Sequence, residues 1–308
     1  MSAADFPPPS SNVINLAYVE IVLSAVFLPL VGFIAWKHGK AGMTCWQIYI
    51  MAFVAKLIAN IYLIVNKEKP LLPTAVSTMT DSSVIATISP GIIGIIYEAN
   101  IILPQQPKKW TEKIILGVTH LANTGGIAVA TYGGAPSAAG KGGVANQELS
   151  RIGNLLMFFV LFTVCGWMWP TYKKITYYRR SGNHPNARAA LVLLWAGVAA
   201  MPIWLGRLSY MCIYAFNRQD TNLDPVMGSF AVKFLLFGRL WGAASALTAG
   251  GWFSQTSMPA GGFLKAREGG RFMVADDEAP LSRQQSGPEE VEMHGHVTRP
   301  KFRVDGFG

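Results

Sequence analysis

Residues 14–36 read INLAYVEIVLSAVFLPLVGFIAW, and this stretch decides the fold class. Glu20 is the one charged residue within it. About 20 apolar residues in a helix suffice to cross a hydrocarbon core roughly 30 Å thick. Charged residues make up only 14% of the whole chain, whereas a soluble domain carries about 25%. The stretch is therefore typical of a membrane-spanning helix.

The same pattern returns six more times along the chain. The further predicted spans cover residues 44–65, 80–103, 112–132, 149–172, 189–216 and 226–253. The span at 112–132 is the weakest, because it contains His120, Asn123 and several glycines. Continuous apolar runs of this length do not fit the alternating pattern of a transmembrane β-barrel. We therefore expect an all-α, polytopic bundle of seven transmembrane helices.

The distribution of polar residues predicts three regions. Residues 1–13 form a short extracytoplasmic segment, and residues 14–253 form the transmembrane domain. From residue 254 to 308 the chain is rich in Glu, Asp, Arg, Gln, Ser, Pro and Gly. Such a segment buries too little apolar surface to offset the entropy of ordering, so we expect a disordered tail.

Lysine and arginine near the span ends predict the orientation, because cytoplasmic loops collect them. Thirteen fall on one side: Lys37, Lys40, Lys108, Lys109, Lys113, Lys173, Lys174, Arg179, Arg180, Arg188, Lys265, Arg267 and Arg271. Five fall on the other: Lys67, Lys69, Lys141, Arg151 and Arg218. We therefore expect the N-terminus outside and the C-terminus in the cytoplasm.

Several function classes lack the residues they need. The net charge of +9 follows from these basic loops, and no basic patch interleaved with aromatic residues points to nucleic acid. A seven-helix zinc hydrolase needs several intramembrane His and Asp residues, and only His120 is available. No nucleophile is paired with a base in the sequence. We expect no enzyme, no metal and no cofactor.

Familiar seven-helix classes are also disfavoured. The inner end of the third span reads EANIILP and has no Asp/Glu-Arg-Tyr, and the last span has no Asn-Pro-x-x-Tyr. Rhodopsin-type receptors are therefore unlikely relatives. A microbial rhodopsin needs a central lysine in the last span, whereas Lys233 lies off-centre without an evident acidic neighbour.

Ionisable groups at membrane depth mark either a buried pair or a functional site. The sequence places these there: Glu20, Lys56, Glu98, His120, Arg207, Lys233 and Arg239. In one interpretation Glu20 and Glu98 neutralise two of the four basic residues. In the other, the two remaining positive charges line a basic, water-accessible cavity. The candidate ligand-binding residues are Glu20, Lys56, His120, Arg207, Tyr210 and Arg239.

Arg207, Tyr210 and Tyr214 share one face of the sixth predicted span, at spacings of three and four residues. That face either lines a binding site or forms a hydrogen-bonded seam between helices.

Several short motifs point to one family. They are Tyr18-Val-Glu-Ile-Val-Leu23, Lys37-His-Gly39, Trp46, Phe53, Ile88-Ser-Pro-Gly91, Pro202-Ile-Trp-Leu-Gly-Arg-Leu-Ser-Tyr210 and Asp224-Pro-Val-Met-Gly-Ser229. Together they resemble a family of uncharacterised fungal integral membrane proteins with seven helices, carried as a domain of unknown function. The resemblance covers roughly residues 15–253.

The resemblance implies a fold and a membrane location, and no established activity. The positions that match the family's recurring residues are Glu20, His38, Gly39, Pro90, Arg207 and Tyr210. The family typically carries an acidic residue in its last helix, and this chain has Lys233 and Arg239 there instead.

Two functions stay open from the sequence, and a purely structural membrane protein is the third alternative. The first is a receptor-like sensor that binds an amphiphilic or anionic ligand and signals through its basic inner loops and tail. The second is a transporter or translocator of small molecules or lipids. A cavity that opens only outwards favours the first, and a path open to both sides favours the second. The one partner common to both is the lipid bilayer.

Overall fold

The computed structural model describes residues 8–69, 75–103, 109–135, 146–181, 186–218 and 220–254. Their secondary structure is helical: α1 (Ser11–Val65), α2 (Ala75–Ile101), α3 (Lys109–Gly134), α4 (Gln147–Arg180), α5 (Ala187–Phe216), the short 3₁₀ helix η2 (Thr221–Leu223) and α6 (Phe230–Ser254). The predicted disordered tail lies, from residue 255 onward, outside the described residues.

Seven stretches of the described helices are long and apolar enough to cross a membrane. They are Ser11–Gly39, Cys45–Val65, Thr80–Ile101, Lys113–Gly134, Gln147–Arg180, Ala187–Phe216 and Phe230–Ser254. This confirms the expected all-α bundle of seven helices, including the fourth span, whose sequence signal was the weakest.

Helix boundaries differ from the predicted spans by a few residues, and two of the differences have an identifiable reason. Helix α4 continues to Arg180, eight residues beyond the predicted end at 172, because the residues that follow are polar but contain no helix breaker before Gly182. Helix α6 starts at Phe230, four residues after the predicted start at 226, because Asp224 and Pro225 open a turn there. Apolarity alone reveals neither feature.

The first two spans form a hairpin with almost no connecting loop. Both belong to α1, which turns at Gly39, where φ is 61° and ψ is −153°. A side chain disfavours such a positive φ, and glycine does not. The two halves then run antiparallel, so that the rings of Phe27 and Phe53 lie 5.4 Å apart.

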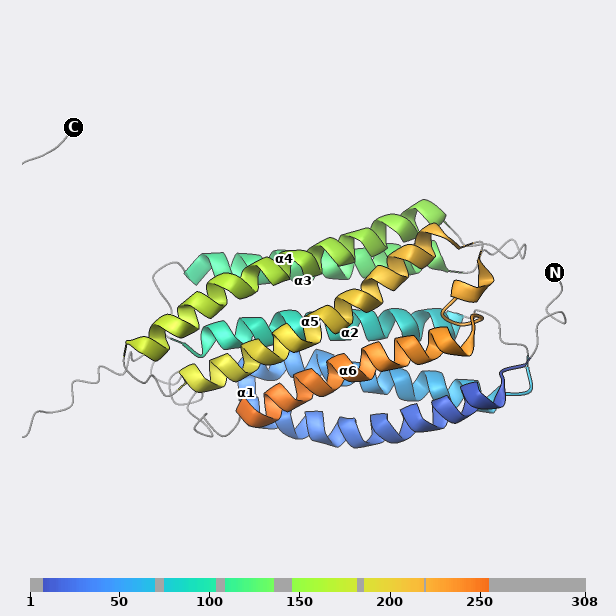
Figure 1. Cartoon of the computed structure of the whole chain (residues 1–308), viewed down its shortest axis with the longest axis horizontal. Coiled ribbons are helices and arrows are strands. Elements are labelled where there is room, and N and C mark those ends of the chain that lie inside the picture. The colour runs from blue at the N-terminus through green and yellow to red at the C-terminus, as the bar shows by residue number, and fades with distance from the viewer. Residues whose placement is uncertain are drawn as a thin grey trace, which may run out of the picture. The chain divides into compact units, whose positions relative to one another are not determined.

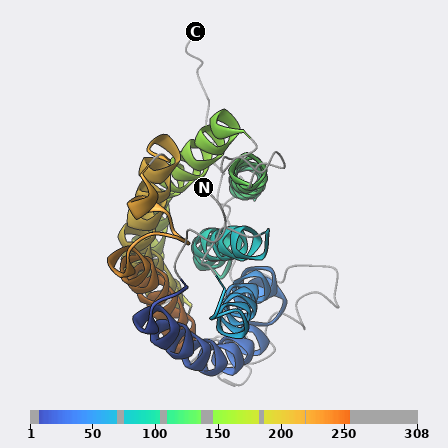
Figure 2. The ribbon, with the colours of Figure 1, turned by 90° about the vertical axis from the view of Figure 1, so that its right-hand side faces the viewer.

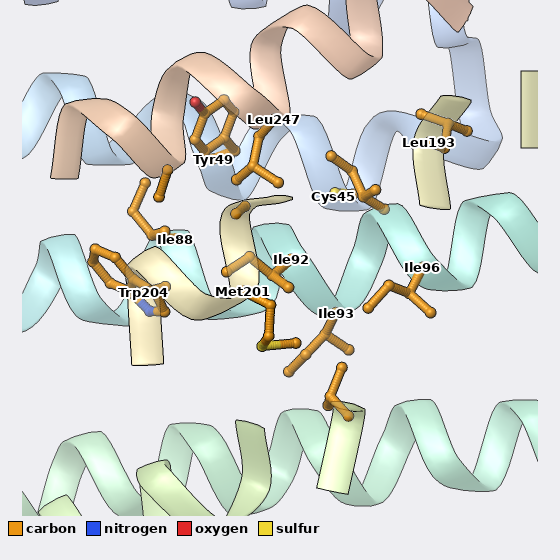
Figure 3. Close-up of a cluster of buried hydrophobic side chains, with 14 of the residues drawn as sticks. Cys45, Tyr49, Ile88, Ile92, Ile93, Ile96, Leu193, Met201, Trp204 and Leu247 are labelled. Atoms are coloured by element: carbon orange, nitrogen blue, oxygen red, sulfur yellow. The ribbon is translucent and has the colours of Figure 1, made fainter. Parts of the chain in front are cut away.

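Helix α2 lies at the centre of the bundle. Figure 1 shows the helices running alongside one another, and the end-on view in Figure 2 shows α2 between α1 and α3, across from α5 and α6. Its isoleucines at 88, 92, 93, 95 and 96 are at most 1% exposed. Figure 3 shows three of them facing Met201 and Trp204 of α5 and Leu247 of α6. This apolar centre separates the two ends of the bundle.

Helix α3 packs mainly against α4. A side chain at Gly153 would meet the Gly126 carbonyl oxygen at 2.5 Å and the Ala130 nitrogen at 2.4 Å. The two helices can approach this closely only because the residue is glycine. Only 17% of the apolar window of α3 is buried, so most of this helix is left for contact with lipid.

Candidate ligand-binding cavity and the closed opposite end

A cavity of about 400 Å³ lies at the end of the bundle where α1 begins, here called the cavity end. Both halves of α1, the start of α2, the middle of α5 and the start of α6 line it, together with the turn before α6. Its lining includes apolar side chains, among them Val13, Leu16, Leu63 and Phe237, as well as charged side chains. The cavity therefore combines the two surfaces that an amphiphile needs.

An ion pair between Lys56 and Glu20 joins the two halves of the α1 hairpin. The Lys56 ammonium lies 3.1 Å from Oε2 of Glu20, and the Asn60 amide donates to the same oxygen at 2.8 Å. Glu20 is buried and Lys56 is half-buried. One oxygen of the carboxylate thus receives both a charged and a neutral donor, which offsets the desolvation of Glu20.

A second ion pair, between Arg207 and Asp81, connects α5 with α2, and Arg207 also contacts α6. Arg207 is 1% exposed, and its Nη2 donates to Oδ1 of Asp81 at 3.3 Å, while its Nη1 donates to the Leu236 carbonyl at 3.2 Å. Its guanidinium carbon lies 5.4 Å from the centre of the Trp204 ring. Arg207 is therefore held by two hydrogen bonds and an aromatic ring, and its buried Nε–H has no acceptor among the described residues.

The turn before α6 forms one wall of the cavity and is held by side chains of α5. Oδ1 of Asp224 accepts from the backbone nitrogens of Val226 and Met227, at 2.7 and 2.9 Å. The Tyr214 hydroxyl donates to the other oxygen of Asp224. This turn presents the Val226 carbonyl to the Lys233 ammonium, which donates to it. Lys233 also lines the cavity.

The structure places the six predicted site residues in different surroundings. Glu20, Lys56 and Arg207 line the cavity together. Tyr210 instead donates its hydroxyl to the Leu223 carbonyl, so on this face the tyrosines form a hydrogen-bonded seam and only Arg207 reaches the cavity.

The remaining two predicted residues lie elsewhere. His120 is half-buried on α3, a helix that contributes no residue to the described cavity wall. Arg239 lies against α5, where a side chain at Gly206 would meet its Nη1 at 2.5 Å. The geometry thus gives neither residue a place among those that line the cavity.

Sequence reasoning missed Asp81, Asn60 and Lys233 as members of this site. Asp81 is the second residue of the third predicted span. Charged residues are common at span ends, so Asp81 was not counted among the charges inside the membrane. Arg207 has Asp81 as its ion-pair partner, a carboxylate that the predicted charge balance did not include. The expected pairing of Glu20 with a basic residue is found with Lys56.

The opposite end, here called the closed end, is sealed by a buried polar cluster. The ring of His38, one residue before the turn in α1, places Nδ1 2.5 Å from Oε1 of Glu98 and Nε2 3.0 Å from the Gly251 carbonyl oxygen. The Trp46 indole donates to the other oxygen of Glu98 at 3.1 Å. Glu98 was expected to neutralise a lysine or arginine, and its partner is a histidine instead.

Glycines bring the elements of the closed end into contact. A side chain at Gly251 would meet the Trp46 ring at 2.4 Å and Ile34 at 2.8 Å. A side chain at Gly42 would meet His38 at 2.7 Å. The close approach of α6 to the α1 hairpin therefore depends on the missing Cβ atoms, and it brings the Gly251 carbonyl within reach of His38.

These features define the class: an integral, multi-pass membrane protein with seven apolar helices. The chain belongs to the family described as Domain of unknown function (DUF7702), whose model matches residues 12–239. The expected family is thereby confirmed, whereas the fungal origin stays a prediction. The comparison with curated proteins and the comparison with solved structures each gave no match.

Proposed function

We propose that the protein binds an amphiphilic molecule with an acidic group in this cavity and acts as a receptor-like sensor. The observation that carries the proposal is the cavity's mixed lining. Four basic side chains, of Lys56, Lys69, Arg207 and Lys233, face two carboxylates, of Glu20 and Asp81. This excess of positive charge favours an anionic group on the ligand.

Lys233 is the best-placed residue to hold that anionic group. Its ammonium uses one donor on the Val226 carbonyl, and an ammonium has three. The ion pairs among the described residues engage Lys56 with Glu20 and Arg207 with Asp81, and they do not include Lys233. An incoming carboxylate or phosphate can therefore bind Lys233 without breaking either pair.

The apolar part of the lining suits a hydrocarbon tail. Leu16, Leu63 and Phe237 contribute to it, and the cavity volume falls within the range of about 300–1,000 Å³ that small-molecule sites occupy. A ligand with an acidic head and an apolar chain satisfies both halves of the cavity at once. A free inorganic anion would leave these apolar side chains in contact with water and would therefore gain nothing from them.

Access from one end supports a sensor rather than a carrier. The residues that line the cavity belong to the cavity end, and beyond them lie Tyr49, Phe53, Ile88 and Trp204, each at most 1% exposed. A transporter or lipid translocator, the alternative function, requires the closed end to open as well. Neither the orientation in the membrane nor the absence of catalysis has been tested, so both stay predictions.

The test measures binding of dodecanoate by native mass spectrometry of the protein in nanodiscs, with dodecanol as the neutral probe of equal length. We expect dodecanoate to bind more tightly than dodecanol. Lys233→Gln should weaken dodecanoate binding about tenfold or more, because a hydrogen bond to a charged group is worth about 1.5–3 kcal/mol.

Arg239→Gln is the matched control, because it removes the same charge from the same helix without altering the described cavity wall. It should leave dodecanoate binding unchanged. Equal binding of dodecanol and dodecanoate, or equal losses in the two variants, would reject the proposed site. Flux of dodecanoate across proteoliposomes would replace the sensor with the transporter.

A further inference from the structure

The buried pair of His38 and Glu98 at the closed end lies apart from the cavity and serves no role in the function proposed above. His38 is 3% exposed and Glu98 is 1% exposed. The pair connects three elements, because His38 precedes the turn in α1, Glu98 lies near the end of α2, and the Gly251 carbonyl belongs to the last turn of α6. Such a pair costs several kcal/mol to bury unless its charge is balanced.

The hydrogen-bond geometry fixes how many protons the pair holds. Both ring nitrogens of His38 face oxygen acceptors, one a carboxylate and the other a backbone carbonyl. A neutral imidazole has a single N–H, so it cannot donate to both. Either the ring carries two N–H groups, or Glu98 carries the second proton and donates it to Nδ1. In both arrangements the pair has no net charge.

Ser254 supplies an alternative partner for the ring. Its hydroxyl lies 3.1 Å from the Gly251 carbonyl oxygen and 3.4 Å from Nε2 of His38. With the pair protonated, the hydroxyl donates to the carbonyl alongside the imidazole N–H. With Nε2 deprotonated, the hydroxyl can rotate and donate to the ring nitrogen instead. The Gly251 carbonyl then loses both donors and faces a lone pair at 3.0 Å.

The other ionisable side chains that the structure describes around the pair are engaged or exposed. From α1, the Cys45 thiol donates to the Gly91 carbonyl at 3.2 Å and the Tyr49 hydroxyl to the Ala244 carbonyl at 2.9 Å. Lys37 is exposed and lies 5.4 Å from the centre of the Trp36 ring. From α4, Lys174 donates to the Asn100 carbonyl at 3.0 Å.

The last two helices add no ionisable group to the cluster. Arg188, at the start of α5, is exposed, and residues 247–254 of α6 contain none. Among the described residues, no third charged side chain joins the ion pair of His38 and Glu98. The cluster therefore gains or loses its proton through these two side chains.

We propose that His38 and Glu98 form a proton-binding site that locks the end of α6 to the α1 hairpin, and that loss of the proton releases α6. The proton passes from the pair to water at the membrane surface and leaves one uncompensated negative charge on Glu98. The charge-assisted bond between His38 and the Gly251 carbonyl is lost, and the Ser254 hydroxyl, which also belongs to α6, offers Nε2 only a weaker neutral bond in its place. At high pH the closed end opens, and at low pH it is held shut.

Cys45 provides a native reporter for this opening. It precedes Trp46 in the cluster and is 5% exposed. Replacing Cys165 and Cys212 by serine leaves Cys45 as the remaining thiol. The experiment measures maleimide labelling of this protein in nanodiscs from about pH 5 to about pH 9, a range that brackets the ordinary titration of histidine. Rates are divided by those of the unfolded protein, which removes the effect of thiol ionisation.

The normalised rate should rise about tenfold or more with pH. Opening is coupled to loss of the proton, so the equilibrium between the closed and open forms changes tenfold for each pH unit by which the pair's proton affinity differs between those forms. Glu98→Gln should abolish the rise. The glutamine amide can donate to Nδ1 while its oxygen accepts from Trp46, so a neutral His38 keeps its N–H for Gly251. A flat wild-type profile, or a Glu98→Gln profile that rises like the wild type, overturns the proposal.

Ser254→Ala provides a second test that does not depend on how well Glu98→Gln folds. Without the hydroxyl, the deprotonated ring has no donor, so the midpoint of the rise should move to higher pH. An unchanged midpoint contradicts the proposed exchange of partners at Nε2. Thermal unfolding of each variant at low pH verifies that the closed form is intact before labelling.

Discussion

The two ends of the bundle use similar chemistry for opposite purposes. Each contains a carboxylate of α2 paired with a basic group from another helix: Asp81 with Arg207 at the cavity end, and Glu98 with His38 at the closed end. Asp81 is 28% exposed, whereas Glu98 is 1% exposed. The cavity gives water access to the carboxylate of the first pair, although Arg207 itself is 1% exposed, whereas packed aromatic rings exclude water from both members of the second.

This difference shows that burial, rather than the number of charges, decides what an ion pair can do in this fold. A pair with access to water can exchange its partner for a ligand at modest cost. A fully buried pair cannot lose one member without leaving an uncompensated charge. The cavity end is therefore suited to binding, and the closed end to holding helices together. The predictions below test this contrast, beginning with the largest expected effect.

Removing the carboxylate at the closed end should cause the largest loss of stability. Glu98→Ala leaves His38 and the Trp46 indole without their acceptor. Breaking a buried pair in this way costs about 3–5 kcal/mol. The measurement is the free energy of unfolding in mixed micelles with a denaturing detergent. The control is Glu148→Ala, which removes an exposed partner of Arg151 and should change this free energy little.

Adding one methyl group at the closed end should have the next largest effect. Gly251→Ala places a Cβ 2.4 Å from the Trp46 ring, and overpacking of this kind costs about 1–3 kcal/mol. Gly238→Ala, in the same helix, adds its Cβ where no atom lies within 4 Å. The midpoint of thermal unfolding should fall for the first variant and hold or rise for the second. Equal falls would show that α6 does not approach the α1 hairpin as closely as described.

Breaking the pair at the cavity end should have the smallest effect on stability. Asp81→Asn removes the charge opposite Arg207 but keeps an oxygen that can accept from Nη2, and the Leu236 carbonyl remains an acceptor for Nη1. We expect a loss of about 1 kcal/mol, the difference between a charge-assisted and a neutral hydrogen bond. The same unfolding assay measures it. A loss as large as that of Glu98→Ala would erase the contrast between the two ends.

The length and apolarity of the spans were predictable from the sequence, because crossing a membrane imposes both requirements on every helix. The contacts between polar residues were less accessible, because they depend on how each helix is rotated about its axis. Glu20 and Lys56 come together only because the turn at Gly39 folds α1 back on itself at that residue. Sequence reasoning selected both residues without a means of pairing them.

The errors have the same origin. Arg239 and Lys233 lie in one helix six residues apart, so they point in different directions from its axis. The position along the predicted span favoured Arg239, which lies near the middle of the helix. The cavity is instead lined by Lys233, near the start of that helix. His38 matched the family pattern, but the Gly251 carbonyl that completes its site is 213 residues away and carries no side-chain signal.

The near-absence of a loop in α1 has a consequence for how the protein is made. A lone first span would have to place Glu20 in hydrocarbon, at a cost of a few kcal/mol for such a charge. The second span, which follows directly after the turn at Gly39, carries the Lys56 and Asn60 side chains that neutralise and solvate it. During synthesis the two spans therefore favour leaving the translocation channel together, as a hairpin whose polar groups are already satisfied.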